Sequence, residues 1–269
     1  MKIWKNTSTL DGYDSGLIFT EEKDQADIAL LGSKSIDLID FPNLNGIFRA
    51  GIGKDNVPEK EAHKKGIIVR YPSEEATNII YNETAAFTSN LILRMLYSYI
   101  GSIDPWTKLD RSELSIKSLL VIGKGNIGSR VVKYMQPFLN VMTFDILQND
   151  INELYKLIPQ ADCITLHIPK TNDNNCFIDK AKLSLMKDGA ILINTSRGHI
   201  VDENSLYNEI KSGRLMAAFD VFWDEPYNGK LKEFHPNNFF MTPHIASTCK
   251  GFLLGCRRGL DLLIKEINP

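Results

Sequence analysis

The stretch Leu119 to Asp145, LLVIGKGNIGSRVVKYMQPFLNVMTFD, decides the fold predicted for this chain. It begins with four consecutive apolar residues, 119–122, a run typical of a strand buried on both faces of a parallel sheet. Three glycines follow at once with the spacing GxGxxG, and a second apolar run, 141–144, ends in an acidic residue. This order of strand, glycines, helix and strand is typical of the βαβ unit that binds a dinucleotide.

Each glycine has a separate task in such a unit. Gly123 permits a tight turn, Gly125 lets the backbone approach a pyrophosphate, and Gly128 lets the next helix pack closely on the strand. The helix predicted from Asn126 presents free N–H groups and the positive end of its dipole to the phosphates. Asp145 would accept hydrogen bonds from the adenosine ribose and repel a 2′-phosphate, which favours NAD over NADP. A purely structural glycine turn is the alternative, because an isolated GxGxxG is a weak signal.

The composition narrows the class of protein. The chain has 269 residues, a net charge of −2 and a pI of about 6.2, so it has no basic field to attract nucleic acid or a membrane surface. It has four cysteines, Cys163, Cys176, Cys249 and Cys256, whose spacing is not that of metal ligands. They predict reduced thiols and no metal site. We find no signal-peptide pattern and no apolar run of transmembrane length. These features predict a cytoplasmic protein that acts on small molecules.

The chain is long enough for two domains, and the nucleotide motif begins only after residue 118. The first hundred residues predict βα repetition and hence a small parallel sheet, with strands at 28–31, 46–48 and 67–69 and a helix at 59–65. A polar stretch, 73–78, precedes a long predicted helix, 79–100. The segment 101–118 has little periodicity and reads as an arm that joins the domains and could pack on a partner subunit.

The second half continues the alternation of short apolar strands and helices. Strands are predicted at 163–166, 190–193, 216–219 and 239–241, and helices at 179–186, 203–212 and 250–267. The last helix should return to the first domain. The fold class is therefore α/β, with two Rossmann-like domains built on parallel sheets and an active site in the interdomain cleft. Residues 1–98 plus 248–269 are predicted to form the substrate domain and 99–247 the NAD-binding domain.

Four residues with complementary chemistry follow strands of the second half, where a parallel sheet presents its ligand groups. Hydride attack on a 2-keto acid leaves an alkoxide, and His244 could supply the proton it needs. Glu225 would orient the imidazole ring and favour its charged form. Arg197 offers a planar, permanently charged donor for the substrate carboxylate and carbonyl oxygen. Asp220 is better placed to bind the nicotinamide carboxamide than to move protons.

Each of these residues also has a plain structural explanation. A single histidine after a proline is usually a loop residue, and Glu-Pro is common at turns. Their shared position at strand ends, in the order Arg, Asp, Glu, His, favours the functional interpretation.

At these residues the chain closely resembles the D-isomer-specific 2-hydroxyacid dehydrogenases, which include phosphoglycerate dehydrogenases, hydroxypyruvate and glyoxylate reductases and D-lactate dehydrogenases. The matching segments are VIGKGNIGS, ITLHIPKT, LINTSRGHIVDE, AAFDVFWDEP and MTPHIAS, which together span most of 119–247. FRAGIGKDNV in the first domain is similar to the family's substrate loop, although Lys54 and Pro58 depart from its usual pattern.

The resemblance implies a role for each matching position. It makes Arg197 the substrate-binding arginine, His244 the acid/base and Glu225 its partner, and the backbone near Ile52 and Gly53 a site for the substrate carboxylate. It places the following residues around NAD: Gly123, Gly125, Asn126, Ile127, Gly128, Asp145, His167, Pro169, Thr195, Ser196, Arg197, Asp220, His244 and Ala246. It also implies a homodimer built on the NAD-binding domains.

Several questions stay open at the level of sequence. The first domain and the segment between Asp145 and Ala161 are shorter than is usual for the family. Ser33, Lys34 and Arg49 are candidates to approach an anionic substrate tail, and the sequence does not distinguish a phosphorylated substrate from a plain 2-keto acid. Two alternatives are an NAD(H)-sensing regulator similar to the corepressors of this family and a formate dehydrogenase-like enzyme. Glu225 argues against the latter, which typically has glutamine there.

Overall fold

A computed structural model describes residues 1–98 and 100–269. The chain divides into two compact units: unit 1 comprises Met1–Glu83 and Ser247–Pro269, and unit 2 comprises Thr84–Ala246. The chain passes from unit 1 to unit 2 inside the long helix α2, Glu74–Leu96. The sequence analysis placed this boundary after residue 98.

Unit 1 is built on a five-stranded sheet with the order β2-β1-β3-β4-β5, in which every neighbouring pair is parallel. Its strands are β1 Lys2–Lys5, β2 Ile18–Phe19, β3 Ile28–Leu31, β4 Gly46–Arg49 and β5 Ile68–Arg70. The three strands predicted for this region and their parallel pairing are thus confirmed. Neither β1 nor β2 was predicted, because both are short and contain only two apolar residues each, too few to show a pattern.

Two apolar clusters cover the two faces of the unit 1 sheet. On one face, α7 (Lys250–Ile267) packs Phe252, Leu260 and Leu263 into a cluster with strand residues such as Ile28 and Phe48. On the other face, α1 (Glu59–Lys64) and the loop segments around it bury a second cluster. The predicted return of the last helix to the first domain is confirmed.

Unit 2 contains a six-stranded, fully parallel sheet with the order β13-β12-β11-β10-β8-β9. Its strands are β8 Ser118–Ile122, β9 Asn140–Phe144, β10 Cys163–Leu166, β11 Ile191–Asn194, β12 Met216–Phe219 and β13 Phe239–Met241. The chain runs outward from β8 to β9 and then crosses back to β10 on the opposite side of β8. This reversal is the topological switch point at which open parallel sheets bind their ligands.

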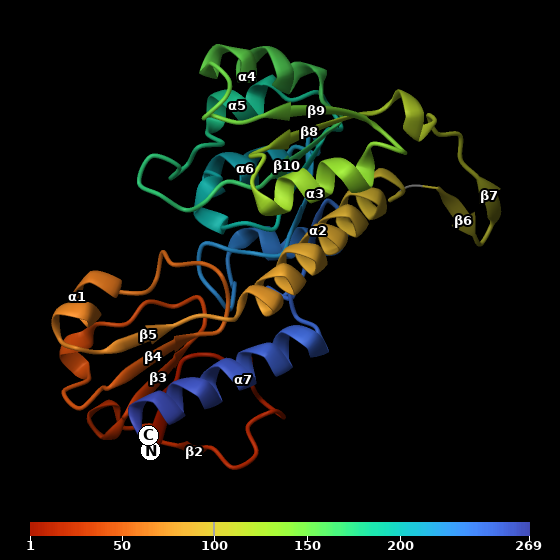
Figure 1. Cartoon of the computed structure of the whole chain (residues 1–269). Coiled ribbons are helices and arrows are strands. Elements are labelled where there is room, and N and C mark those ends of the chain that lie inside the picture. Colours follow the sequence, from red (N-terminus) through yellow and green to blue (C-terminus); the bar gives the residue numbers. More distant parts are fainter. Residues whose placement is uncertain (99) are drawn as a thin grey trace. The chain divides into compact units, whose positions relative to one another are not determined.

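Helices cover both faces of this sheet (Figure 1). The second part of α2 and α3 (Asn126–Met135) pack on the face to which Leu119 and Val121 point. On the opposite face, Leu120 and Ile122 lie in a cluster with the helices α4 Ile151–Leu157, α5 Lys180–Leu185 and α6 Glu203–Lys211. Alternate residues of one strand thus enter different cores, which is why β8 reads as a continuous apolar run.

The start of α2 corrects one prediction. Residues 73–78 were predicted to be a polar stretch outside the helix, but the helix begins at Glu74. Ser73 Oγ accepts a hydrogen bond from the Ala76 amide at 3.3 Å, and two glutamates occupy the first turn. Polar and acidic residues at this position stabilise a helix N-terminus, so their polarity marks its start. The helix ends at Leu96, and residue 99 of the predicted range lies outside the described residues.

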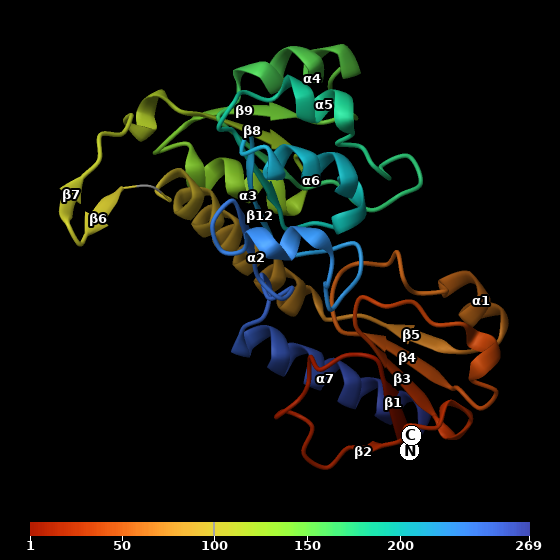
Figure 2. The same ribbon diagram turned by 180° about the vertical axis from the view of Figure 1, so that it is seen from behind.

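The predicted arm contains a small antiparallel hairpin formed by β6 (Gly101–Ile103) and β7 (Trp106–Lys108). Figure 2 shows it extending away from the six-stranded sheet of unit 2. All six strand residues are exposed, including Ile103 and Trp106. The remaining elements are short 3-10 helices: η1 Lys23–Gln25, η2 Leu38–Asp40, η3 Leu114–Ile116, η4 Ile158–Gln160, η5 Gly198–Ile200 and η6 Lys230–Phe234.

Replacing Phe219 with alanine tests the packing of the unit 2 sheet. Its side chain is fully buried at the end of β12 and contacts the rings of Trp223 and Phe239. We expect the free energy of unfolding in urea to fall by about 3–5 kcal/mol, because the change leaves a cavity. Phe138→Ala, at a phenylalanine that is 48% exposed, is the matched control and should lose far less. Equal losses in the two variants would contradict this description of the core.

Candidate active site

The carboxyl ends of the six strands of unit 2 lie along one edge of the sheet. The registers pair Ile122 with Phe144 and Leu166, and continue in step across β11, β12 and β13. The ladder extends one residue beyond the strands, since the amide of His167 donates to Ile122 O at 2.7 Å. The residues that follow the strands therefore form one row along this edge: Asp145, Gly123, His167, Thr195, Asp220 and Thr242.

The glycine turn is required by close backbone packing. Gly123 has φ +93°, and a Cβ there would lie 2.5 Å from the carbonyl oxygen of His167. A Cβ on Gly128 would lie 1.9 Å from the carbonyl oxygen of Gly123. Both positions therefore exclude a side chain, the first for conformation as well as space and the second because α3 lies against the turn.

The surroundings of Gly125 differ from those of the other two glycines. No atom lies within 4 Å of the place a Cβ would take, and this residue is the N-cap of the ten-residue helix α3. Space in front of a helix N-terminus, with free N–H groups directed into it, suits a phosphate group. The turn therefore fits the pyrophosphate of a dinucleotide.

Asp145 holds the far side of this turn. Its Oδ2 accepts a hydrogen bond from the amide of Lys124 at 2.8 Å, and its Oδ1 accepts one from the amide of Leu147 at 3.0 Å. Each carboxylate oxygen can accept more than one hydrogen bond. The side chain thus fixes the glycine turn and keeps acceptor capacity for the ribose hydroxyls predicted from the sequence.

His167 lies at the switch point, beside the glycine turn. Its Nε2 is 3.0 Å from the hydroxyl of Thr165, which is fully buried. Desolvation lowers the pKa of His167 to about 3, so the ring is neutral at physiological pH. Two residues further on, the carbonyl of Pro169 accepts a hydrogen bond from Asn174 Nδ2 at 2.8 Å.

Asn194 organises the turn that carries Arg197. This fully buried amide donates from Nδ2 to the carbonyl oxygen of Arg197 at 2.9 Å. Its Oδ1 accepts from the amide of Ser196 at 3.0 Å and from the Ser196 hydroxyl at 2.9 Å. Arg197 Nη1 donates in turn to the carbonyl of Ser196 at 2.8 Å. The sequence analysis assigned no role to Asn194, although its place at the end of a buried strand was a signal.

Gly198 brings the Arg197 turn against the next loop. A Cβ at Gly198 would lie 2.1 Å from the carbonyl carbon of Phe222 and 2.5 Å from the amide nitrogen of Trp223. Two backbones are therefore in direct contact here, and only glycine fits. The indole Nε1 of Trp223 also donates to the carbonyl of Val201 at 2.8 Å. These contacts, which the sequence analysis did not predict, join the turn of Arg197 to the loop of Glu225.

His244 and Glu225 form the pair expected from the sequence. Nδ1 of His244 lies 3.0 Å from Glu225 Oε1 and 2.8 Å from Oε2, and Oε1 also accepts from the amide of Phe222 at 3.1 Å. The carboxylate thus holds the ring through Nδ1 and directs Nε2 away from itself. Within the part of the chain that the structure describes, Nε2 has no hydrogen-bond partner, and a third of the His244 side chain is exposed.

Asp220 shapes the loop on which His244 lies. The side chain is fully buried, and burial raises its pKa, an effect that its hydrogen bonds oppose. Oδ1 accepts from the Thr242 hydroxyl at 2.6 Å and from the amide of Ile245 at 2.9 Å, and Oδ2 accepts from the amide of Ala246 at 2.9 Å. These bonds flank His244, whose φ of +55° is unusual for a residue with a side chain. Asp220 binding to the carboxamide stays a prediction.

Thr195 is tied to α2 as well as to the sheet. Its side-chain oxygen lies 2.8 Å from the hydroxyl of Thr88, which donates to the carbonyl of Thr84 at 2.7 Å. The Thr195 hydroxyl must therefore donate to Thr88, since a hydroxyl has a single proton.

In unit 1, Arg49 organises the loop predicted to bind the substrate. Only 5% of this residue is exposed. Its Nη1 donates to the carbonyl of Ala50 at 2.6 Å and its Nε to the carbonyl of Gly53 at 3.2 Å, while Asn56 Oδ1 lies 3.2 Å from the same Nε. Arg49 was expected to approach an anionic substrate tail, but these contacts give its side chain a role inside the loop.

The backbone of this loop retains donors. Within residues 1–98 and 100–269, the amides of Ile52 and Gly53 donate to no protein acceptor. Both residues are partly exposed, so the amides are accessible to a ligand. Two adjacent backbone N–H groups of this kind suit a carboxylate.

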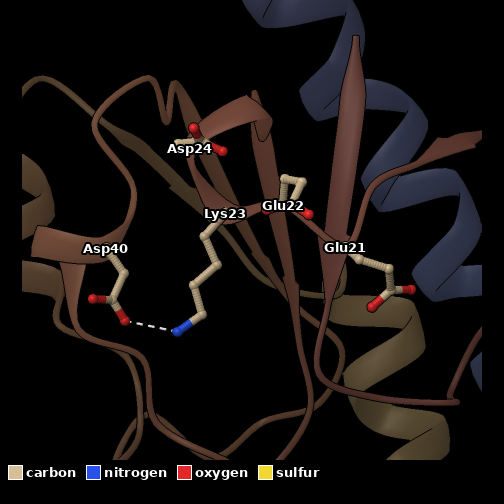
Figure 3. Close-up of a pocket in the computed structure, with 5 residues that line it drawn as sticks. All are labelled: Glu21, Glu22, Lys23, Asp24 and Asp40. Carbon is tan, nitrogen blue, oxygen red and sulfur yellow. Dashed lines mark hydrogen bonds and ion pairs between the residues drawn. The ribbon is translucent and has the colours of Figure 1, made fainter.

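A separate hollow of about 440 Å³ on unit 1 does not share this chemistry. It is lined by Glu21, Glu22, Lys23, Asp24 and Asp40, and Figure 3 shows Lys23 directed at Asp40, with Nζ 2.7 Å from Oδ2. Four carboxylates beside one paired lysine would repel an anionic substrate. None of the residues predicted to act in the site lines this hollow.

The described residues contain neither a cluster of metal ligands nor a helix that could span a membrane. The described residues contain no group of three or more His, Cys, Asp or Glu side chains arranged to hold a metal ion. None of the helices that the structure describes combines the length and the apolar character needed to cross a bilayer.

Comparison with known proteins gives the family. Residues 102–246, more than half of the chain, match the model of the D-isomer specific 2-hydroxyacid dehydrogenase NAD binding domain. The chain belongs to the D-isomer specific 2-hydroxyacid dehydrogenase family. It is an oxidoreductase, and the residues that form the glycine turn, α3 and the six-stranded sheet are its NAD-binding domain.

Individual relatives of this dehydrogenase family agree with the match. The chain is 34% identical over 239 residues to a hydroxypyruvate reductase of Thermotoga maritima. This alignment covers 83% of this chain and 76% of that protein. It is 37% identical over 205 residues to a D-3-phosphoglycerate dehydrogenase of Methanocaldococcus jannaschii, covering 68% of this chain but only 38% of the relative.

A solved structure supports the same assignment. The D-lactate dehydrogenase from Aquifex aeolicus, in complex with NAD and lactic acid, aligns with a TM-score of 0.74 and 26% identity. The alignment covers 98% of this chain and 94% of that one. The predicted fold class and cofactor are thus confirmed at the level of the family.

Replacing His167 with glutamine tests its desolvated, neutral ring. An unfolded histidine takes up a proton near pH 6.5, whereas the folded ring stays neutral down to about pH 3. The unfolded state binds more protons between these values, so the free energy of unfolding of the parent chain should fall as the pH drops below about 6.5.

The His167→Gln variant lacks this contribution. Its free energy of unfolding should therefore approach that of the parent chain as the pH is lowered from about 7 to about 4 in urea titrations. His63→Gln, at an exposed histidine of α1, is the control and should change in parallel with the parent. A constant difference between His167→Gln and the parent over this range would contradict the description of His167.

Proposed function

We propose that this dehydrogenase interconverts a small D-2-hydroxy acid and its 2-keto acid, of the glycerate and hydroxypyruvate, glyoxylate or phosphoglycerate class. The observation that carries the proposal is the His244–Glu225 pair, in which Nδ1 is held at 2.8 Å and Nε2 is left for a substrate. The names of the relatives, a hydroxypyruvate reductase and a D-3-phosphoglycerate dehydrogenase, support the same substrate class.

When bound, NAD would accept a hydride from the carbon that bears the oxygen, and NADH would donate a hydride to that carbon. We infer that the N–H groups of Asn126, Ile127 and the glycine turn hold its pyrophosphate and that Asp145 binds its adenosine ribose. The other residues proposed to contact the cofactor line the same sheet edge or its loops: His167, Pro169, Thr195, Ser196, Arg197, Asp220, His244 and Ala246.

His244 moves the proton in this mechanism. During reduction of a 2-keto acid, Nε2–H of the charged ring donates to the developing oxyanion at C2, and in oxidation the neutral Nε2 removes the hydroxyl proton. Glu225 accepts from Nδ1 throughout and so fixes the ring orientation in both directions.

Arg197 binds and orients the substrate. Its guanidinium is a planar donor that can bond the carboxylate and the carbonyl oxygen together, and such an arrangement restricts the substrate to one orientation. The unpaired amides of Ile52 and Gly53 are proposed as further donors to the carboxylate.

Replacing His244 with alanine tests the acid/base role. Turnover with NADH and a reactive 2-keto acid should fall at least about 100-fold, because the proton donor is lost. The dissociation constant for NADH, measured by fluorescence titration, should change far less than turnover, since Nε2 acts on the substrate.

Two further variants make the test specific. Glu225→Gln keeps an acceptor for Nδ1 but loses the charge, so it should retain more activity than His244→Ala. His63→Ala, at an exposed histidine of α1, should behave like the parent chain. Undiminished turnover of His244→Ala would refute the mechanism.

The substrate can be assigned with a panel. Oxidation of NADH is followed with hydroxypyruvate, glyoxylate, pyruvate, 2-ketoglutarate and phosphohydroxypyruvate, with NADPH alongside. The rival function is an NAD(H)-sensing regulator on the same fold, since fold alone does not fix function. Tight NADH binding without turnover on the whole panel would favour that regulator. Turnover of formate would favour a formate dehydrogenase-like enzyme, the alternative that Glu225 argues against.

We also propose a homodimer built on the NAD-binding domain, in which the β6–β7 hairpin contacts the partner. An isolated two-stranded hairpin is marginally stable in water, and this one exposes 84% of Ile103 and 79% of Trp106. A cytoplasmic location is proposed on the basis of the four free cysteines.

Replacing Trp106 with serine tests the dimer. The change removes apolar area from the proposed contact, so light scattering after size exclusion should show a larger monomer fraction at low micromolar concentration. Ile39→Ser, at an exposed isoleucine of unit 1, is the control and should leave the mass unchanged. A parent chain that is monomeric at all concentrations would contradict the proposal.

A further inference from the structure

The turn that carries Arg197 depends on a single buried side chain. Asn194 is fully buried at the end of β11, and its amide bonds to both residues that set the direction of the arginine. Nδ2 donates to the carbonyl of Arg197 at 2.9 Å, while Oδ1 accepts from the amide and from the hydroxyl of Ser196 at 3.0 and 2.9 Å.

The same turn also receives the guanidinium. Arg197 Nη1 donates to the carbonyl of Ser196 at 2.8 Å. Ser196 therefore contacts both side chains, since its own amide donates to Asn194 Oδ1. Arg197 itself has extended backbone, with φ −147° and ψ 139°. The carbonyl of Ser196 is therefore a contact through which the fold of this short turn acts on the guanidinium.

We propose that Asn194 is a positioning residue for the reaction: through its amide it sets the orientation in which Arg197 meets the substrate carboxylate and carbonyl. This inference rests on the substrate-binding role proposed for Arg197. Asn194 does not contact substrate or cofactor in this account. It acts because the amide group offers a donor and an acceptor at the same time, which the turn uses on two adjacent residues.

Asn194→Asp is the sharpest test because the two side chains have nearly the same shape. The aspartate keeps an acceptor for Ser196, but when ionised it places a negative oxygen against the carbonyl of Arg197 in place of a donor. Catalytic efficiency, kcat/KM for the 2-keto acid, should fall about 10- to 100-fold at pH 8, as expected when a binding group is displaced by about 1 Å. The dissociation constant for NADH should change less than kcat/KM, because the other proposed cofactor contacts lie outside this turn.

The pH profile of this variant separates positioning from simple damage. A protonated carboxyl group has an O–H that can donate to the Arg197 carbonyl, as the amide does. Burial raises the pKa of a carboxyl group, so this form should be reached at mildly acidic pH. The ratio of kcat/KM between variant and parent chain, measured at each pH, should therefore rise towards 1 between about pH 8 and about pH 5. Asn194→Ala, which has no titratable group, should show a low ratio that does not change with pH.

A double-variant cycle tests whether Asn194 acts through Arg197. In an Arg197→Ala background, Asn194→Asp should have little further effect on kcat/KM, because the group it positions is absent. If Asn194→Asp does not fold at pH 8, as judged by thermal melting, Asn194→Ala takes its place in the cycle. An equal loss in both backgrounds, or a ratio for Asn194→Asp that stays flat with pH, would overturn the inference.

A control variant, Asn140→Asp, and the single variant Arg197→Ala separate failure of the positioning role from failure of the proposed function. Asn140 also donates its amide to a backbone carbonyl, Ser115 O at 2.9 Å, but at the opposite, amino end of the sheet. Asn140→Asp should therefore keep the kcat/KM of the parent at every pH. Undiminished kcat/KM in Arg197→Ala alone would show that the proposed role of Arg197 is wrong, whereas a loss there with an additive effect of Asn194→Asp would reject only the positioning role.

Discussion

The parallel ladder of the unit 2 sheet is the constraint on which the candidate site depends. Because its six strands run in one direction and in register, the residues that follow them must meet along one edge. Gly123, His167 and Asp220 lie far apart in sequence and are brought into a row by this register alone. The reversal between β9 and β10 then opens a position at this edge where a dinucleotide can lie against the first helix N-terminus. Without the ladder, the same side chains would be unrelated loop residues.

Buried polar side chains turn this row into defined geometry. Asn194 and Asp220 are both fully buried, and the side chain of each forms hydrogen bonds to the loop or turn that follows a strand. A buried polar group without partners costs free energy, so each such side chain holds its loop in the one conformation that satisfies it. Burial raises the pKa of Asp220, and its three hydrogen bonds offset part of that effect. In unit 1, Arg49 stabilises the Ala50–Gly53 loop in a similar way.

The predictability of the molecule differs between its parts for physical reasons. Strands such as β8 and β10 were found because burial on both faces requires a continuous apolar run. β1 and β2 were missed because they are short and contain too few apolar residues to form a pattern, and the β6–β7 hairpin because its residues are all exposed. The first turn of α2 was mistaken for a polar linker, since the residues that stabilise a helix N-terminus are the same polar residues that are common in loops.

The sequence by itself determined the class of the fold, the glycine turn and the acid that follows β9, and it supplied the hypothesis that Arg197, Glu225 and His244 act together, because each has a residue type and spacing that few other structures require. It could not determine what holds them. The contact of Gly198 with the Phe222–Trp223 backbone, and the hydrogen bonds of Asn194 and Asp220, exist only after distant strands have paired. A glycine, an asparagine or an aspartate can serve many purposes, and its neighbours in space, which the tertiary structure alone supplies, decide which one it serves.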